Sequence, residues 1–235
     1  ADDMIYHVTH DLRAPLRALK ALPEWIADDC ASQGLNLPES VSENLDTIAA
    51  QATALDQMVL DLRDYSRVGR CADPDDVVAI EAVISEVLAE LTPTPALKLE
   101  VQLEMPEIVA PANEIRLLLS TLLKNAVQHH DDNRANVTIS SKLNTDTALI
   151  CVTDDGPGIP PDMRDRAFAP MTTLYRREEG AGTGLGLTTA RRIVSNLGGE
   201  ILLSTPPTGR GLRVEVQLPA ERALTCSTFK TKRTA

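Results

Sequence analysis

Hydrophobic residues recur every three to four positions at the start of the chain, which is the repeat of an amphipathic helix. The members of this first stripe are Ile5, Val8, Leu12, Leu16, Leu19, Leu22 and Ile26. A second stripe follows a loop around Gly34 and Pro38 and contains Leu45, Ile48, Ala52, Leu55, Val59 and Leu62. Ser40 and Glu43 have the spacing of a capping box, so they predict the start of the second helix.

Two amphipathic helices cannot enclose a core by themselves. A dimeric four-helix bundle, with two helices from each subunit, is the economical way to bury both stripes. The alternative is a hairpin packed on the rest of its own chain. At about 100° per residue, His10 points away from the centre of its stripe and is predicted to face solvent, whereas Trp25 lies on the apolar side and is predicted to pack.

The pattern changes after Val68. Residues 69–76 are polar, contain glycine and proline, and are predicted to form a linker. Strand-like runs at 77–80, 97–103, 136–143, 149–154, 200–204 and 212–218 then mix with helical patterns at 81–91, 112–128 and 185–197. The predicted fold class is therefore α+β: a helical hairpin over 1–68, then over 77–220 an α/β sandwich with a mixed, mostly antiparallel sheet and helices on one face. Residues 221–235 lack such periodicity and are predicted to be a mobile tail.

Two glycine-rich segments flank a polar stretch in the second half of the chain. Asp154 ends a predicted buried strand and is followed at once by Gly156 and Gly158, which allow a ligand to approach the backbone closely. Further glycines open the helical pattern after residue 181, and free N–H groups at a helix start suit phosphate. These features predict a nucleotide site with a glycine-hinged lid. The alternative is a glycine-rich surface loop; a P-loop and a Rossmann turn do not match the local pattern.

A polar amide interrupts an otherwise apolar helical run upstream. The run from Ile115 to His130 carries Asn125 near its end. Such an amide usually bonds locally, but its oxygen can also coordinate Mg²⁺.

The segments H-D-L-R-A-P-L, L-L-K-N-A, D-D-G-P-G-I and G-T-G-L-G-L occur in this order over most of the chain. They resemble the H box, the N box and the two glycine boxes of sensor histidine kinases of two-component signalling. That family's ATP-binding domain has the Bergerat fold, shared with gyrase-type, mismatch-repair and heat-shock ATPases. The H box is similar to that of phytochrome-like and other photoreceptor-linked kinases.

The resemblance implies ATP and Mg²⁺ as cofactors and His10 as the phosphoacceptor that attacks the γ-phosphate. Asp11, beside it, can accept the proton on the other ring nitrogen and fix the tautomer. Asn125 would ligate Mg²⁺ and Asp154 would bind the adenine amino group. The nucleotide-binding set that the resemblance implies is Lys124, Asn125, His129, Asp154, Gly156, Gly158, Ile159, Arg176, Gly182, Thr183, Gly184, Leu185 and Gly186.

Three positions bear on the details of this activity. Ala14 stands where bifunctional kinases of the family place Thr or Asn, so phosphatase activity toward the partner is predicted to be weak. Gln128 replaces a frequent phosphate-contacting Lys, so the phosphate charge is met elsewhere, with Lys124 or His129 among the candidates. Thr121 stands where a hydrolase of this fold carries a carboxylate, which disfavours ATP hydrolysis as the main activity. A non-catalytic nucleotide-binding scaffold and a serine kinase are the remaining alternatives, and both are disfavoured by the intact motifs.

The net charge of −11 disfavours a nucleic-acid-binding surface and favours protein partners. Four cysteines show no metal-ligand spacing, and Cys151 lies in a predicted strand, so reduced thiols and a cytoplasmic location are expected. The sequence has no apolar run of bilayer-spanning length. The expected partners are a second copy of the chain and the receiver domain of a response regulator, with the sensor domain expected upstream of this chain.

Overall fold

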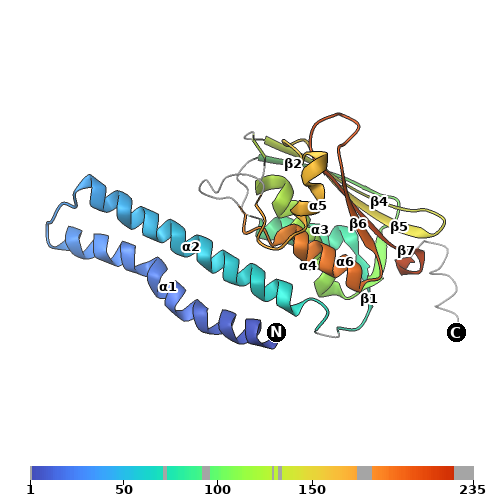
Figure 1. The fold of residues 1–235 in the computed structure, drawn as a ribbon. Coiled ribbons are helices and arrows are strands. Elements are labelled where there is room, and N and C mark those ends of the chain that lie inside the picture. The colour runs from blue at the N-terminus through green and yellow to red at the C-terminus, as the bar shows by residue number, and fades with distance from the viewer. Residues whose placement is uncertain are drawn as a thin grey trace.

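A long helical hairpin precedes the rest of the molecule. The computed structural model describes residues 2–70, 73–91, 96–128, 130–131, 134–173 and 182–224. Helices α1 (Asp2–Ser32) and α2 (Glu39–Arg67) run side by side in opposite directions (Figure 1), and Lys20 Nζ lies 3.5 Å from Asp56 Oδ2 across the pair. The predicted helical hairpin is therefore confirmed.

The start of α2 differs from the prediction. Pro38 occupies the N-cap position, no side chain caps the helix, and α2 begins at Glu39. Ser40 and Glu43 therefore lie inside the helix and do not form the predicted capping box. The ring of Pro38 restricts φ, which is −58° here, so the chain enters the helix before Ser40 can act as a cap.

The second part contains a five-stranded sheet in the order β2-β4-β5-β7-β6. Its strands are β2 (Ala96–Leu103), β4 (Arg134–Leu143), β5 (Thr147–Asp154), β7 (Arg213–Pro219) and β6 (Glu200–Ser204). β2 pairs with β4 in parallel, and the other neighbours are antiparallel. This confirms the predicted mixed, mostly antiparallel sheet.

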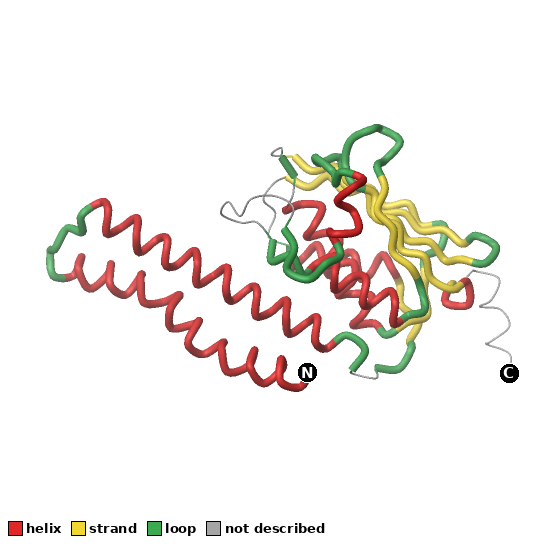
Figure 2. Tube along the Cα trace, in the orientation of Figure 1, coloured by secondary structure: helices red, strands yellow, loops and turns green. Residues whose placement is uncertain are grey.

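Helices α3 (Ile80–Glu90), α4 (Ala112–Gln128) and α6 (Gly186–Asn196) lie together beside the sheet, as Figure 2 shows. The apolar positions of α4 recur at helical spacing and are buried: Ile115, Leu118, Leu119, Leu122 and Leu123. They join a continuous core with β4, whose residues alternate between buried and more exposed positions. A short 3₁₀ turn, η1 (Pro161–Met163), and α5 (Arg164–Ala167) follow β5.

A second, smaller sheet was not predicted. It has the order β1-β3-β8 and contains β1 (Asp76–Ala79), β3 (Glu107–Ala110) and β8 (Ala223–Leu224). β3 is a four-residue strand between two prolines, so its sequence resembles a loop. The predicted mobile tail is wrong for residues 221–224, because η2 (Ala220–Arg222) leads directly into β8, which pairs with β3.

The hairpin joins the second part through residues after α2. Val68 is buried in the core of the α/β part, and the N–H of Gly69 donates a hydrogen bond to Glu114 Oε1 at 3.1 Å. Asn113 Nδ2 also donates to Asp73 Oδ2 at 2.8 Å. Both contacts tie the connecting segment to the start of α4. Within the described residues, no helix combines the length and apolar character needed to cross a lipid bilayer.

Candidate functional site

A cavity of about 780 Å³ lies between α2, α4, the end of β5 and the loops before α6. Most of the predicted nucleotide-binding residues line it: Lys124, Asn125, Asp154, Gly158, Ile159, Gly182, Thr183, Gly184, Leu185 and Gly186. Gly156 does not line the cavity but donates its N–H to Asp154. His129 and Arg176 lie outside the described residues. The fold thus brings together residues that are more than 60 positions apart in the sequence, such as Lys124 and Gly186.

Asp154 is the last residue of strand β5, and the hydrogen bonds from described residues reach only one oxygen of its carboxylate. Its Oδ1 accepts hydrogen bonds from the backbone N–H groups of Gly156 and Leu212, each at 3.0 Å. Burial raises the pKa of this carboxyl, although both hydrogen bonds act in the opposite direction. Among the described residues none donates a hydrogen bond to Oδ2, so this oxygen can accept an N–H from a ligand in the cavity.

The loop before α6 requires glycine at one position for steric reasons. Gly184 has φ +73°, and a Cβ there would lie 2.8 Å from the carbonyl carbon of Met171 and the nitrogen of Thr172. Gly184 therefore packs closely against the backbone of Met171 and Thr172, which lie within the predicted lid segment. Helix α6 then begins at Gly186, and its first-turn N–H groups have no helical partners, which favours an anion.

Asn125 is half-buried in the cavity wall, next to the exposed Lys124. Its amide oxygen is a suitable ligand for Mg²⁺. Among the described residues, no group of three or more His, Cys, Asp or Glu side chains could hold a metal ion. Beside a nucleotide, Mg²⁺ usually keeps several waters and binds phosphate oxygens, so it needs few protein ligands.

Helix α2 closes one side of the cavity, which the sequence did not predict. Asp61 accepts a hydrogen bond from the Thr183 hydroxyl, and Asp61 and Asp64 both line the cavity. Nearby, the Arg192 guanidinium lies 4.6 Å from the ring centre of Tyr65. No sequence signal marks these α2 residues, because polar side chains on a helix usually face water.

His10 lies on α1 and does not line the cavity. Its side chain is 78% exposed, which confirms the predicted solvent-facing orientation. His10 Nδ1 is 3.2 Å from Asp11 Oδ1. Because an ionised carboxylate only accepts hydrogen bonds, Nδ1 carries the proton in this contact and Nε2 has the free lone pair.

Two sequence families cover most of the chain. Residues 1–70 match the His Kinase A (phospho-acceptor) domain, and residues 111–222 match the histidine kinase-, DNA gyrase B- and HSP90-like ATPase domain. The first match contains His10, and the second contains the cavity residues of α4, β5 and α6. The chain belongs to the sensor histidine kinase family.

Curated sensor kinases match nearly the full chain. The adaptive-response sensory kinase SasA of Trichormus variabilis is 30% identical over 222 residues, covering 88% of this chain and 55% of SasA. The sensor protein KdpD of Rathayibacter rathayi is 31% identical over 219 residues, covering 92% of this chain and 25% of KdpD. The chain therefore spans about half the length of SasA and a quarter of KdpD.

Solved structures share the fold. Full-length ShkA in complex with AMPPNP has a TM-score of 0.68 at 20% identity, covering 93% of this chain and 46% of that one. The Acinetobacter baumannii histidine kinase AdeS has a TM-score of 0.61 at 23% identity, covering 90% of this chain and 98% of that one. The hairpin-plus-sandwich architecture is thus that of histidine kinases.

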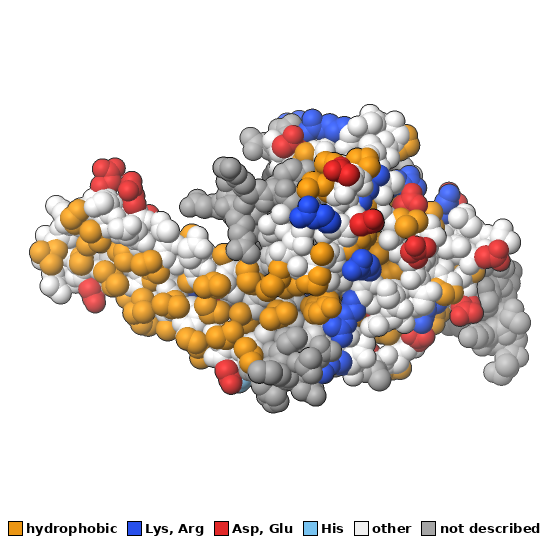
Figure 3. All heavy atoms as spheres, viewed as in Figure 1, with side chains coloured by type: hydrophobic (Ala, Val, Ile, Leu, Met, Phe, Trp, Pro, Cys, Tyr) orange, Lys and Arg blue, Asp and Glu red, His pale blue; other side chains and the backbone are white. Residues whose placement is uncertain are grey.

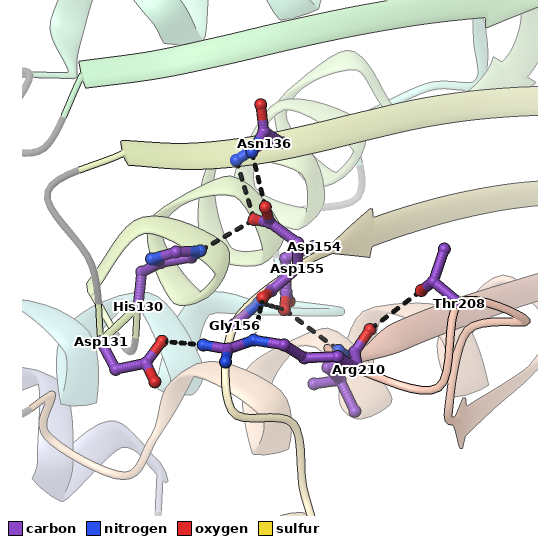
Figure 4. A network of polar contacts seen from close by, with 9 residues as sticks. His130, Asp131, Asn136, Asp154, Asp155, Gly156, Thr208 and Arg210 are labelled. Atoms are coloured by element: carbon purple, nitrogen blue, oxygen red, sulfur yellow. Dashed lines mark hydrogen bonds and ion pairs between the residues drawn. The ribbon is translucent and has the colours of Figure 1, made fainter.

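In this histidine kinase a polar network also lies behind Asp154, and the sequence did not reveal it. His130 follows helix α4, and its Nε2 lies 2.8 Å from Asp155 Oδ1. Arg210, on the loop between β6 and β7, donates to the Asp155 carbonyl oxygen at 2.9 Å (Figure 4). The one sequence signal for this network is that D-D-G-P-G-I contains two consecutive aspartates.

Proposed function

We propose that this chain is the catalytic core of a sensor histidine kinase, which transfers the γ-phosphoryl group of ATP to His10. One observation carries the proposal: an exposed imidazole, hydrogen-bonded to Asp11, occurs in the same chain as the cavity around Asp154 and Asn125. A scaffold that only binds nucleotide has no need of an activated, solvent-facing histidine.

The chemistry at His10 follows from the tautomer. With its Nδ1 proton directed at Asp11, Nε2 attacks the γ-phosphorus. The new N–P bond forms as the bond from the γ-phosphorus to the β,γ-bridging oxygen breaks, and ADP leaves with that electron pair. The imidazole gains positive charge as the bond forms, and the Asp11 carboxylate stabilises it. Phosphoryl transfer is mainly positioning and charge neutralisation, so this site needs few other catalytic groups.

The residues of the cavity would divide the nucleotide between them. Asp154 would accept the adenine amino N–H at Oδ2, and the backbone of Gly182–Gly186 with Lys124 would hold the phosphates. Asn125 would ligate Mg²⁺, which neutralises phosphate charge. The other proposed nucleotide contacts are His129, Gly158, Ile159, Arg176, Thr183 and Leu185, while Gly156 would act through its hydrogen bond to Asp154.

His10 is not among the residues lining the cavity, so transfer to the His10 of the same chain requires a placement of residues 77–224 different from the present one. We infer that residues 77–224 move relative to the hairpin of residues 1–68 by a change in the segment 69–76. In the present arrangement Asp61 and Thr183 hold the two parts together.

We further propose three partner relations. A second copy of the chain covers the exposed apolar stripe of the hairpin. An aspartate in the receiver domain of a response regulator accepts the phosphoryl group from His10. The location would be cytoplasmic, where ATP and receiver domains are found.

Incubation with γ-labelled ATP and Mg²⁺ tests the main proposal, comparing the native chain with His10→Gln. Acid-labile label on the native chain and none on the variant is the expected result. Intact ATP binding with no label on the native chain would instead favour the scaffold.

The absence of a hydrogen-bonding side chain at Ala14 predicts weak phosphatase activity. The native chain should not speed up the dephosphorylation of the receiver domain beyond its spontaneous rate. Ala14→Asn should speed it up, because an amide one turn from His10 can orient water. Rapid receiver dephosphorylation stimulated by the native chain would refute this proposal.

A further inference from the structure

The carboxylate of Asp155 is surrounded by hydrogen-bond donors from two other segments (Figure 4). Its Oδ1 accepts from the backbone N–H of Asn136 at 2.9 Å and lies 2.8 Å from His130 Nε2. Its Oδ2 accepts from Asn136 Nδ2 at 2.5 Å. Asp155 therefore links Asn136 of β4 and His130, which follows α4, to the glycine turn after β5.

The contact between His130 and Asp155 is buried on the histidine side and open to solvent on the carboxylate side, because the Asp155 side chain is 42% exposed. The His130 side chain is only 3% exposed. Since an ionised carboxylate cannot donate, His130 Nε2 must carry the proton toward Asp155. Burial opposes ionisation of Asp155, but the hydrogen bonds from Asn136 and His130 outweigh it and hold the pKa of this carboxyl below its ordinary value.

The backbone around the two aspartates is held from the opposite side by residues 210–212. Arg210 Nε donates to the carbonyl oxygen of Asp155 at 2.9 Å. The Asp154 N–H donates to the carbonyl oxygen of Leu212, and the Leu212 N–H donates to Asp154 Oδ1. Gly211 lies so close that a Cβ on it would be 1.9 Å from the Asp154 carbonyl oxygen. The peptide between Asp154 and Asp155 is thus clamped between two segments.

We propose that His130 and Asp155 are positioning residues for base recognition: their contact fixes the turn that presents Asp154 Oδ2 to the exocyclic amine of adenine. This inference rests on the proposed function, because it takes Asp154 as the residue that binds the base. Asp154 and Asp155 are consecutive, yet Asp154 lines the cavity while Asp155 bonds the network behind it. The first contacts the nucleotide, and the second acts only through the first.

If Asp155 only positions Asp154, replacing it should weaken the binding of nucleotides that carry the exocyclic amine and leave the binding of others nearly unchanged. Asp155→Ala should weaken ATP binding on the order of tenfold, as expected when a charge-assisted hydrogen bond is misaligned. Purine riboside triphosphate lacks the exocyclic amine, so its weaker binding should change less than about twofold. A merely structural role for Asp155 would lower both affinities together.

The experiment measures dissociation constants of both nucleotides with Mg²⁺ by calorimetry on the full chain. The variants are Asp155→Ala, Asp155→Asn, His130→Ala and His130→Gln, beside Asp154→Ala as reference. Glu215→Ala is the matched control, because Glu215 pairs with Arg213 at 2.6 Å on β7 and is outside this network. Melting temperatures are recorded for every variant.

The expected result is an ATP-selective loss for Asp154→Ala, Asp155→Ala and His130→Ala, and none for Glu215→Ala. His130→Gln, which keeps an N–H donor close to the place of Nε2, should restore most of the affinity. If Asp155→Ala does not fold, Asp155→Asn and the two His130 variants decide the outcome.

Two results overturn the inference in distinguishable ways. Equal losses for both nucleotides, or no loss, in Asp155→Ala and His130→Ala while Asp154→Ala is ATP-selective would refute the positioning role alone. An Asp154→Ala variant that binds both nucleotides as the native chain does would refute the base contact itself, and the positioning role with it.

Discussion

The hairpin and the α/β part differ in how much of their large apolar side chains is exposed to solvent. In the α/β part most large apolar side chains of α4 and many of the sheet are essentially fully buried, including Ile115, Leu118 and Ile139. In the hairpin, Trp25 is 59% exposed and Ile48 is 47% exposed. Figure 3 shows the resulting apolar surface running along the hairpin. Residues of this surface are Val8, Leu12, Leu19, Leu22, Trp25, Ile26, Leu35, Val41, Ile48 and Leu55.

This difference shows where each part obtains its stability. The α/β part has a core of its own. The hairpin buries only a thin seam between its helices, which includes Leu16, Ala52 and Val59. Exposed apolar area of this extent on two helices favours a four-helix bundle with a second copy, in which both stripes leave water. Trp25, predicted to pack, is exposed in the single chain and would be covered in such a dimer.

The largest expected effect comes from removing the apolar stripe of the hairpin. Ile26→Glu with Ile48→Glu should convert a dimer to a monomer, because a symmetric bundle would bury four charges in place of four isoleucines. The loss is on the order of 5 kcal/mol, because a fully buried side chain contributes about 1.5–3 kcal/mol and these four are already roughly half-buried in the single chain. Light scattering after size exclusion measures the mass. Leu202→Glu, at a 40% exposed position on β6, is the control and should stay dimeric. A dimer that survives the double substitution would contradict the comparison.

A second substitution tests the close packing of the α/β part at the site. Gly184→Ala should destabilise this part by about 1–3 kcal/mol and weaken ATP binding, because left-handed backbone strain adds to the clash with Met171 and Thr172. Gly209→Ala is the control: its φ is +80°, but no atom lies within 4 Å of the added Cβ. Chemical denaturation should show the smaller loss for Gly209→Ala, and equal losses would mean that packing at Gly184 is unimportant.

The charge of Asp154 should lower stability at neutral pH. Its pKa is raised by burial, so its contribution to folding is complete below the unfolded pKa and is lost as pH rises through the folded pKa. Asp154→Asn does not titrate and should melt at a higher temperature than the native chain at neutral pH, with the difference shrinking as the pH falls. The same variant should bind ATP more weakly. A melting difference that grows toward acid pH would have the wrong sign.

The smallest effect is expected at the contact between the hairpin and the α/β part. Asp61 accepts a hydrogen bond from Thr183, and its carboxylate lines the cavity proposed for a triphosphate. Asp61→Ala should therefore strengthen ATP binding several-fold, as expected when roughly 1 kcal/mol of charge repulsion and competition is removed. Asp56→Ala is the control, since Asp56 pairs with Lys20 and does not line the cavity. Calorimetry with ATP measures both, and weaker binding in Asp61→Ala would show that Asp61 helps the nucleotide.

The order of the local elements was accessible from the sequence. The helix over residues 112–128 and the strand over residues 200–204 have the predicted bounds, because their apolar residues repeat with the period of the element. The exposure of His10 and the position of Asp154 at a strand end follow from the same local geometry. Motif order then indicated the family.

Other features depended on contacts between residues far apart in the chain. Strand β8 exists because β3 offers it a partner, and neither four-residue β3 nor two-residue β8 has a period to detect. Asp61 meets Thr183 across 122 positions, and His130 meets Asp155 across 25. Periodicity reports which face of a helix or strand is apolar, over a few residues only. Which polar groups meet once those faces are buried is decided by how the elements pack, and here that packing placed α2 against the cavity and His130 behind Asp154.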